Sequence, residues 1–255
     1  MKYAWRYPLV HAATLALAPL LFLQGRWTRA RTPRLPDAPG AAEGTHAGDG
    51  DAVRLLVVGE SPVAGVGHGS HESAIGGQLG AALAQVSGRT VWWKARGITG
   101  TRVMDYVTTL QREDWQEHAD VCVVVFGVND TTGLRSPTQF SRDMHTLLAT
   151  LRTRVTTSRG AVLPLMLAGV PPLHAFPALP QPLRTVMGWR SACLDASLAE
   201  LAGRTPHAAH VPTPIRDDGD FVEDGYHPGP VGCRDWARML APHLWGLMQR
   251  ACRSG

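Results

Sequence analysis

Cysteine is scarce in this chain, which has four among its 255 residues. The four are Cys122, Cys193, Cys233 and Cys252, and their spacing contains no pair typical of a structural metal site. Cys122 lies within an apolar run and is predicted to be a buried free thiol. The other three allow one disulfide without requiring it, so the sequence leaves the redox compartment open.

Acidic residues are absent from positions 1–36. The basic residues there are Lys2, Arg6, Arg26, Arg29, Arg31 and Arg34. Removing these 6 from the 25 basic residues of the whole chain leaves 19, against 21 acidic residues, so the net charge of +4 becomes −2 beyond position 36. The positive charge therefore belongs to one end of the chain. It favours a segment beside a membrane, and we expect no nucleic-acid partner.

The chain also lacks a long hydrophobic run. The apolar stretch Pro8–Leu23 is shorter than the roughly 20 residues that a membrane-spanning helix needs. Basic residues precede it, as in a signal peptide, but Thr28-Arg29-Ala30 is a poor cleavage site, and the arginines that follow resist translocation. Three interpretations are open: a membrane anchor or interfacial helix, a cleaved export signal, and a disordered tail or misassigned start. We expect a membrane-associated or exported protein, with the cytoplasmic face also open.

The pattern of composition divides the chain into three parts. Residues 1–36 are interpreted as the leader, and residues 37–51, in a stretch rich in Pro, Gly and Ala, as a flexible linker. Residues 52–250 are interpreted as one folded domain without internal repeats.

Five apolar runs predict buried strands, because their continuous apolarity is typical of strands covered on both faces. The runs are Val53–Val58, Thr90–Lys94, Asp120–Phe126, Ala161–Ala168 and Ala208–Pro212. Helix-like segments separate or follow them: Ser73–Val86, Arg102–Gln111, Pro137–Val155, Pro182–Ala202 and Val231–Gln249. Such alternation predicts an α/β fold, a three-layer α/β/α sandwich with a central, mostly parallel five-stranded sheet.

Ser61 follows the first predicted strand directly. The carboxyl ends of parallel strands are where open α/β sheets bind ligands. A serine there becomes a nucleophile only if a base takes its proton and a third group orients that base. Asp224 and His227 lie three residues apart in one loop and are candidates for orienter and base. Either motif alone is also typical of an ordinary turn or a solvated loop.

An acyl-transfer site also needs donors for the oxyanion of its tetrahedral intermediate. The backbone N–H groups of Ser61 and Gly97 and the side-chain amide of Asn129 are candidates, since each follows a predicted strand.

In their order along the chain, these blocks resemble those of the SGNH hydrolases, also called GDSL esterases and lipases. The four blocks are Gly59-Glu60-Ser61, Gly97-Ile98-Thr99-Gly100, Gly127-Val128-Asn129-Asp130 and Asp224-Gly225-Tyr226-His227-Pro228. The resemblance covers roughly residues 53–245. It implies a flavodoxin-like fold and a triad of Ser61, His227 and Asp224. It also implies an oxyanion hole of Ser61, Gly97 and Asn129.

One position departs from the family pattern, which usually has Asp where this chain has Glu60. A role for the carboxylate in holding either the turn or the neighbouring loop by hydrogen bonds tolerates the extra methylene. The α/β-hydrolase elbow Gly-x-Ser-x-Gly is absent, because Val63 stands two residues after Ser61. The stretch Gly65–Gly69 lacks the ending of a phosphate-binding loop and is interpreted as shaping the chain after Ser61.

Three further features have a structural and a functional interpretation. A metal site is conceivable from His68 and His71 with Asp217, Asp218 and Asp220, but their spacing favours a solvated loop. The Trp92-Trp93 pair is interpreted as core plus cover rather than a stacking platform. The stretch from Gly169 to Pro182 is either the wall of an acyl pocket or a stiff connector.

The sequence therefore predicts a serine ester hydrolase without metal or cofactor, acting on a small-molecule, lipid or glycan ester. A glycan O-deacetylase or acyltransferase using the same site is the first alternative. A non-catalytic binding module on the same fold is the second. The acyl group, the alcohol and the oligomeric state stay open.

Overall fold

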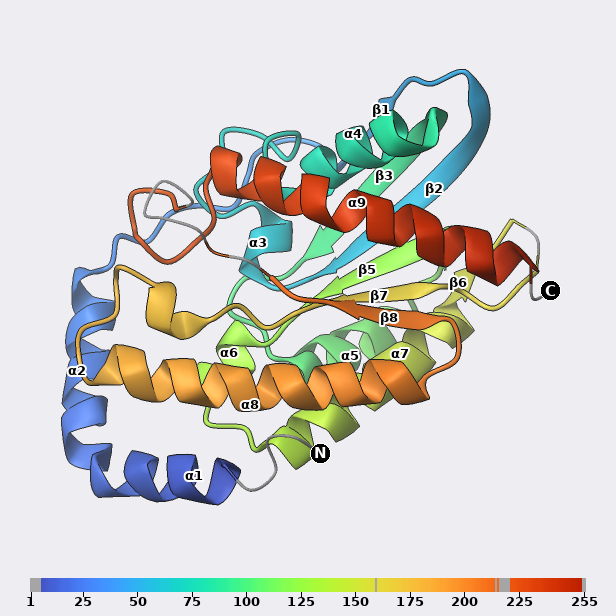
Figure 1. Ribbon diagram of the computed structural model, residues 1–255. Helices are drawn as coiled ribbons and strands as arrows, with labels where there is room; N and C mark the ends of the chain where they lie inside the picture. The colour runs from blue at the N-terminus through green and yellow to red at the C-terminus, as the bar shows by residue number, and fades with distance from the viewer. Residues whose placement is uncertain (1–5, 159, 214, 216–220, 254–255) are drawn as a thin grey trace.

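The computed structural model describes residues 6–158, 160–213, 215 and 221–253 (Figure 1). Its strands are β1 (Glu43–His46), β2 (Gly50–Gly59), β3 (Arg89–Gly97), β4 (Glu117–His118), β5 (Val121–Val125), β6 (Val155–Thr156), β7 (Leu165–Ala168) and β8 (Ala208–Val211). Its helices are α1 (Tyr7–Ala16), α2 (Ala18–Arg31), α3 (Ser61–Ala64), α4 (Ile75–Ser87), α5 (Val103–Arg112), α6 (Val128–Thr132), α7 (Pro137–Arg154), the 3-10 helix η1 (Leu173–Ala175), α8 (Leu183–Arg204) and α9 (Pro230–Arg253).

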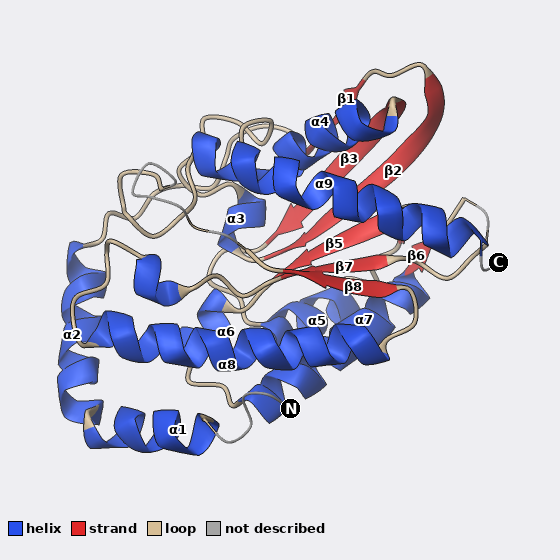
Figure 2. Cartoon of the chain, viewed as in Figure 1, coloured by secondary structure: helices blue, strands red, loops and turns tan. Residues whose placement is uncertain are grey.

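Within the described residues one six-stranded sheet has the order β1-β3-β2-β5-β7-β8 (Figure 2). All neighbours pair in parallel except β1, which runs antiparallel to β3 at the edge. The five parallel strands alone have the flavodoxin-like order 2-1-3-4-5, whose switch point lies between β2 and β5. The three-layer sandwich and its five predicted strands are confirmed. A separate pair, β4 and β6, lies outside this sheet.

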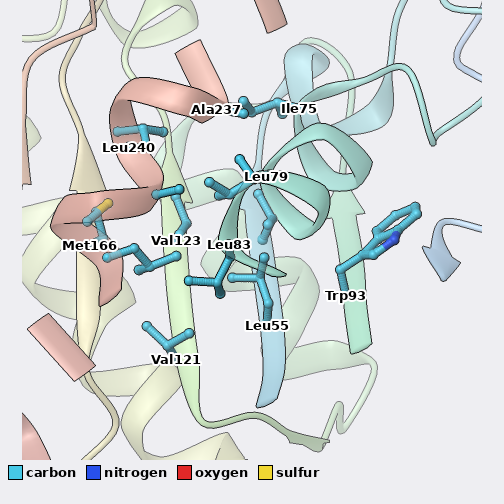
Figure 3. Packing of buried hydrophobic residues seen from close by; sticks show 14 of the residues in the cluster. Leu55, Ile75, Leu79, Leu83, Trp93, Val121, Val123, Met166, Ala237 and Leu240 are labelled. Carbon is cyan, nitrogen blue, oxygen red and sulfur yellow. The ribbon is translucent and has the colours of Figure 1, made fainter. Parts of the chain in front are cut away.

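Helices cover both faces of the sheet (Figure 1). Leu55 and Val57 of β2 face α4 and α9, whereas Leu56 and Val58 face the layer that contains α5, α7 and α8. Figure 3 shows part of the first core, where Leu79 and other α4 side chains pack over the strands. Because successive residues of a strand point to opposite faces, a central strand of this fold must be apolar at every position.

Two strands differ from the prediction for physical reasons. The strand β7 begins at Leu165 rather than Ala161, because Pro164 has no N–H to donate to a ladder, although its carbonyl still accepts from Cys122 N at 3.0 Å. The strand β1 comes from the stretch interpreted as linker. Its residues Glu43–His46 have no apolar alternation, so no strand signal was present in the sequence.

The cysteines and tryptophans have ordinary structural environments. Cys122 is a fully buried thiol, as predicted, and Cys193 and Cys233 are buried thiols that no disulfide joins. Trp93 lies in the core and Trp92 is 42% exposed, which confirms the interpretation of the pair as core plus cover.

Truncating the core should cost more than truncating the surface of the same helix. Leu79→Ala removes a fully buried side chain of α4, and we expect a loss of about 2–5 kcal/mol in the free energy of unfolding. Val86→Ala, on the same helix but 42% exposed, should cost less than about 0.5 kcal/mol. Urea denaturation of both variants measures the two values. Equal losses would contradict the packing described for this face.

Candidate active site

Ser61 begins the short helix α3, immediately after β2 ends. It therefore lies at the carboxyl edge of the sheet, beside the switch point between β2 and β5. The residue is 8% exposed. Because Ser61 is the first residue of the helix, its N–H has no acceptor within α3 and can serve an outside group.

His227 and Asp224 reach Ser61 from the loop before α9. Nε2 of His227 lies 2.9 Å from Ser61 Oγ, and Nδ1 of His227 lies 2.6 Å from Oδ2 of Asp224. The other oxygen of Asp224 accepts from the backbone N–H groups of Tyr226 (2.8 Å) and His227 (2.9 Å). The structure thus brings together the three residues that the sequence predicted as a triad.

The hydrogen bonds around Asp224 determine which ring nitrogen of His227 carries the proton. Burial tends to raise the pKa of Asp224, but hydrogen bonds from His227 and from two backbone N–H groups outweigh it and lower the pKa below its usual value. An ionised carboxylate only accepts, so Nδ1 of His227 carries the proton and Nε2 is left to accept from the Ser61 hydroxyl.

Two glycines allow close packing at the ends of β3 and β5. A Cβ on Gly97 would lie 2.0 Å from the backbone nitrogen of Ala64, so the end of β3 can touch α3 only with glycine at this position. Gly127, directly before α6, has φ +132° and would place a Cβ 2.6 Å from Val170. At both positions steric packing alone therefore explains why the residue is glycine, independently of catalysis.

The amide of Asn129 is already hydrogen-bonded in this structure. Its Nδ2 donates to Glu60 Oε2 at 2.6 Å and to the carbonyl of Thr101 at 3.1 Å. An amide NH₂ has two hydrogens, so both are engaged. The structure places Asn129 beside Glu60 and Ser61, as predicted, but its donors point into the protein rather than into open space.

Glu60 holds the turn after β5. Its Oε1 accepts from Val128 N at 2.9 Å, and its Oε2 accepts from both the backbone and the side chain of Asn129. These bonds tie the turn that carries Ser61 to a neighbouring loop. The extra methylene relative to Asp gives the carboxylate the reach it has here.

Glu60 is also electrostatically unusual. Burial raises its pKa from 4.5 to about 7, with the nearby Asp130 adding to the rise, while its three N–H donors partly offset it. Asp130 is buried too, and desolvation raises its pKa to about 6. Two carboxyl groups therefore share the space beneath the candidate site.

His68 is a site residue whose role was not predicted. Its Nε2 donates to the carbonyl of Pro228, next to His227, at 2.9 Å, and its Nδ1 lies 3.1 Å from the Ser73 hydroxyl. Burial lowers the pKa of His68, which favours the neutral ring that this pattern uses. The residue thus links the chain after Ser61 to the loop of His227, and only its spatial position shows this.

The described residues contain no group of three or more His, Cys, Asp or Glu side chains placed to hold a metal ion. Asp217, Asp218 and Asp220 of the conceivable metal set lie outside the described residues. His68 and His71 are buried, rather than part of a solvated loop.

An apolar pocket adjoins Ser61 and His227. Pro171 and Phe176, from the stretch predicted as either pocket wall or connector, line it. The sequence analysis did not identify the other apolar lining residues as part of a pocket; among them are Val128, Ile215, Phe221, Tyr226 and Trp236. Phe176 makes edge contacts with Phe221 and Tyr226, at ring-centre distances of 5.3 and 5.1 Å.

Comparison with known proteins identifies related sequences and folds. The profile of the GDSL-like Lipase/Acylhydrolase family matches residues 57–234, more than half of the chain. The GDSL-like esterase Rv1075c of Mycobacterium tuberculosis is 28% identical over 243 residues, which cover 86% of this chain and 74% of the relative.

Two solved structures show the same fold. The family 3 carbohydrate esterase of Clostridium thermocellum superposes with a TM-score of 0.57 at 16% identity, covering 78% of this chain and 98% of the other. The inhibitor-bound aryl esterase of M. smegmatis superposes with a TM-score of 0.57 at 18% identity, covering 76% and 99%.

Glu60 should make folding stability depend on pH. Its pKa is about 7 in the folded protein against 4.5 for the exposed group, so between these pH values the folded state holds more protons than the unfolded chain. Stability should therefore fall as the pH rises through this window and level off above it, by on the order of 3 kcal/mol in total.

The matched variant is Glu60→Gln, which cannot ionise. Urea denaturation from acidic to neutral pH measures the free energy of unfolding of both proteins. As the pH rises, the wild type should lose stability relative to the variant. Asp130 titrates in both proteins and largely cancels. A difference that does not change with pH would show that Glu60 has an ordinary pKa.

Proposed function

The chain belongs to the GDSL-like lipase/acylhydrolase family, a family of ester hydrolases, and from this premise we propose that it is a serine ester hydrolase with Ser61, His227 and Asp224 as its catalytic triad. The observation that carries the proposal is the continuous chain of hydrogen bonds from Asp224 through His227 to the Ser61 hydroxyl. A serine, a base and an orienter in this geometry are the requirements for nucleophilic acyl transfer.

Acylation begins when Ser61 Oγ attacks the ester carbonyl carbon. His227 Nε2 takes the hydroxyl proton as the new C–O bond forms, and the carbonyl electrons move to its oxygen. Asp224 stays ionised and stabilises the imidazolium through the Nδ1 hydrogen. His227 then gives its proton to the leaving alcohol, and the carbonyl re-forms as the acyl-enzyme on Ser61.

The oxyanion of the intermediate needs N–H donors. We assign this role to the N–H groups of Ser61 and Gly97 and to the Asn129 amide. The bond from Asn129 to Thr101 O, at 3.1 Å, is longer than the 2.6 Å bond to Glu60. The oxyanion displaces the longer bond, while Glu60 keeps the amide in place. Deacylation repeats the sequence with water as nucleophile and His227 as base.

The family implies a small-molecule ester as substrate, and the pocket suggests its acyl part. Aromatic and aliphatic side chains line the space next to Ser61, so an apolar acyl chain loses water there at little cost in polar contacts. We propose esters of apolar carboxylic acids rather than acetylated sugars as the preferred class.

The triad can be tested by substitution and labelling. Ser61→Ala and His227→Ala should each lower kcat for a short p-nitrophenyl ester by on the order of 10⁴-fold or more, because the nucleophile or its base is removed. A fluorophosphonate probe should label Ser61 in the wild type. Ser141→Ala on α7 is the matched control and should keep full activity. Retained activity in Ser61→Ala would refute the triad, and no labelling of folded wild type would favour a binding module.

The acyl preference can be tested with a series of p-nitrophenyl esters of rising chain length. We expect kcat/KM to increase from acetate to longer acyl chains, by about tenfold or more for each methylene that the pocket desolvates. A maximum at acetate, with release of acetate from acetylated sugars, would instead favour the glycan deacetylase. Product formed on an added alcohol in preference to water would favour acyl transfer.

A further inference from the structure

The N-terminal helix pair, α1 and α2, is bent by 78° near Leu17. Among the described helices none is by itself long and apolar enough to cross a membrane, although this bent pair meets the criteria when taken together. The pair has two different faces, and each can be assigned from the exposure of its side chains.

The inner face is part of the folded domain. Leu21 is 6% exposed and lies in one apolar cluster with Phe176 and Leu183. The Gln24 side chain donates to Gln181 O at 2.6 Å and accepts from Leu183 N at 3.1 Å, at the start of α8. Figure 1 shows α2 passing this end of α8 and α1 lying along it. The leader is therefore seated on the domain by apolar and polar contacts.

The outer face is unusually apolar. Of the twelve exposed large hydrophobic side chains of the described chain, six lie on this helix pair. We define the outer face by these six, which are 45–65% exposed: Leu9, Leu15, Leu20, Phe22, Leu23 and Trp27. On α2, Leu20 precedes the inner position 21, and Phe22, Leu23 and Trp27 stand between the inner positions 21, 24 and 28. One helix therefore buries one side in protein and leaves another, apolar side open.

Positive charge accompanies this apolar surface. Arg26, Arg29 and Arg31 lie on α2, and no acidic residue occurs before Asp37. The guanidinium of Arg31 stacks 4.4 Å from the Trp27 ring centre, and that of Arg26 lies 5.8 Å from the ring of Phe22. Apolar and aromatic side chains beside arginines, without any acid, match the interface of an anionic lipid bilayer.

The inner face leads to the candidate active site. The cluster that contains Leu21 also contains Phe176, and Phe221 and Tyr226 pack against this cluster. All three aromatic residues line the pocket beside Ser61. A surface bound to the outer face of α2 would therefore lie behind one wall of this pocket.

We propose that the outer face docks on the surface of an anionic lipid bilayer, with the helix pair lying in the headgroup region and not crossing it. Docking depends on the side chains of α1 and α2 alone and not on the reaction at Ser61. It holds the pocket next to the lipid, where apolar esters concentrate.

Flotation of the full chain with lipid vesicles tests the proposal. The wild type should float with vesicles of phosphatidylcholine that contain a minority of phosphatidylglycerol, and less with phosphatidylcholine alone. Phe22→Ser/Leu23→Ser/Trp27→Ser should lower the partition coefficient by at least about tenfold, because three apolar groups are lost. The matched control Val86→Ser/Trp92→Ser/Val162→Ser changes three exposed hydrophobic side chains elsewhere and should bind as the wild type does.

Charge and activity provide separate readouts. Arg26→Gln, Arg29→Gln and Arg31→Gln should each weaken binding to the anionic vesicles by about fivefold, and added salt should weaken wild-type binding. Hydrolysis of a water-soluble short ester should be unchanged in the outer-face variant, which shows that it folds. Ser61→Ala should float as the wild type does, so docking and the proposed function fail independently.

Four results would overturn the proposal. The first would be that the wild type stays in the soluble fraction with anionic vesicles. The second would be that the outer-face variant floats as well as the wild type. The third would be that the wild type is a dimer, the outer-face variant is a monomer, and neither binds vesicles; the outer face would then be an interface between two copies of the chain. The fourth would be an intact mass, measured on the protein isolated from cells, that shows the chain to begin beyond residue 31; the helix pair would then be a cleaved export signal.

Discussion

The site depends on one buried carboxylate. Glu60 stands between the end of β2 and Ser61, and it binds three N–H groups of the turn after β5. Those bonds fix the position of Asn129 relative to Ser61, although Glu60 is 68 residues from Val128 and 69 residues from Asn129 in the chain. Burial of the carboxylate opposes its ionisation, and the three donors oppose that effect. The geometry of the site is therefore held by a group close to its own titration point.

The sheet supplies the remaining alignment. Parallel strands in the order β3-β2-β5 end at the same edge, so Gly97, Ser61 and Asn129 meet without long connections. His227 and Asp224 come from outside the sheet, on the loop before α9, and short local hydrogen bonds within that loop hold them in place. His68 ties the same loop to the segment after Ser61. Rigid strand ends and a tethered loop together set the 2.9 Å contact between His227 and Ser61.

Much of this arrangement could be predicted because it is local in the sequence. The strands are continuous apolar runs, and Asp224 and His227 lie in one loop. Other features arise only from tertiary contacts. Phe176 and Phe221 meet in the pocket wall from segments 45 positions apart, and β1 pairs with β3 through its backbone, without an apolar pattern. The direction of the Asn129 amide depends on Glu60 and Thr101, which no motif specifies.

The bond between Gln24 and Leu183 joins residues 159 positions apart, and this has a consequence for biosynthesis. The ribosome releases α2 long before α8, so Leu21 has no partner until most of the chain has been made. At roughly 5–20 residues per second, that delay is on the order of ten seconds or more. During this time the apolar side chains of α2 are exposed, and whatever surface they meet first will act on a nascent chain rather than on a finished enzyme.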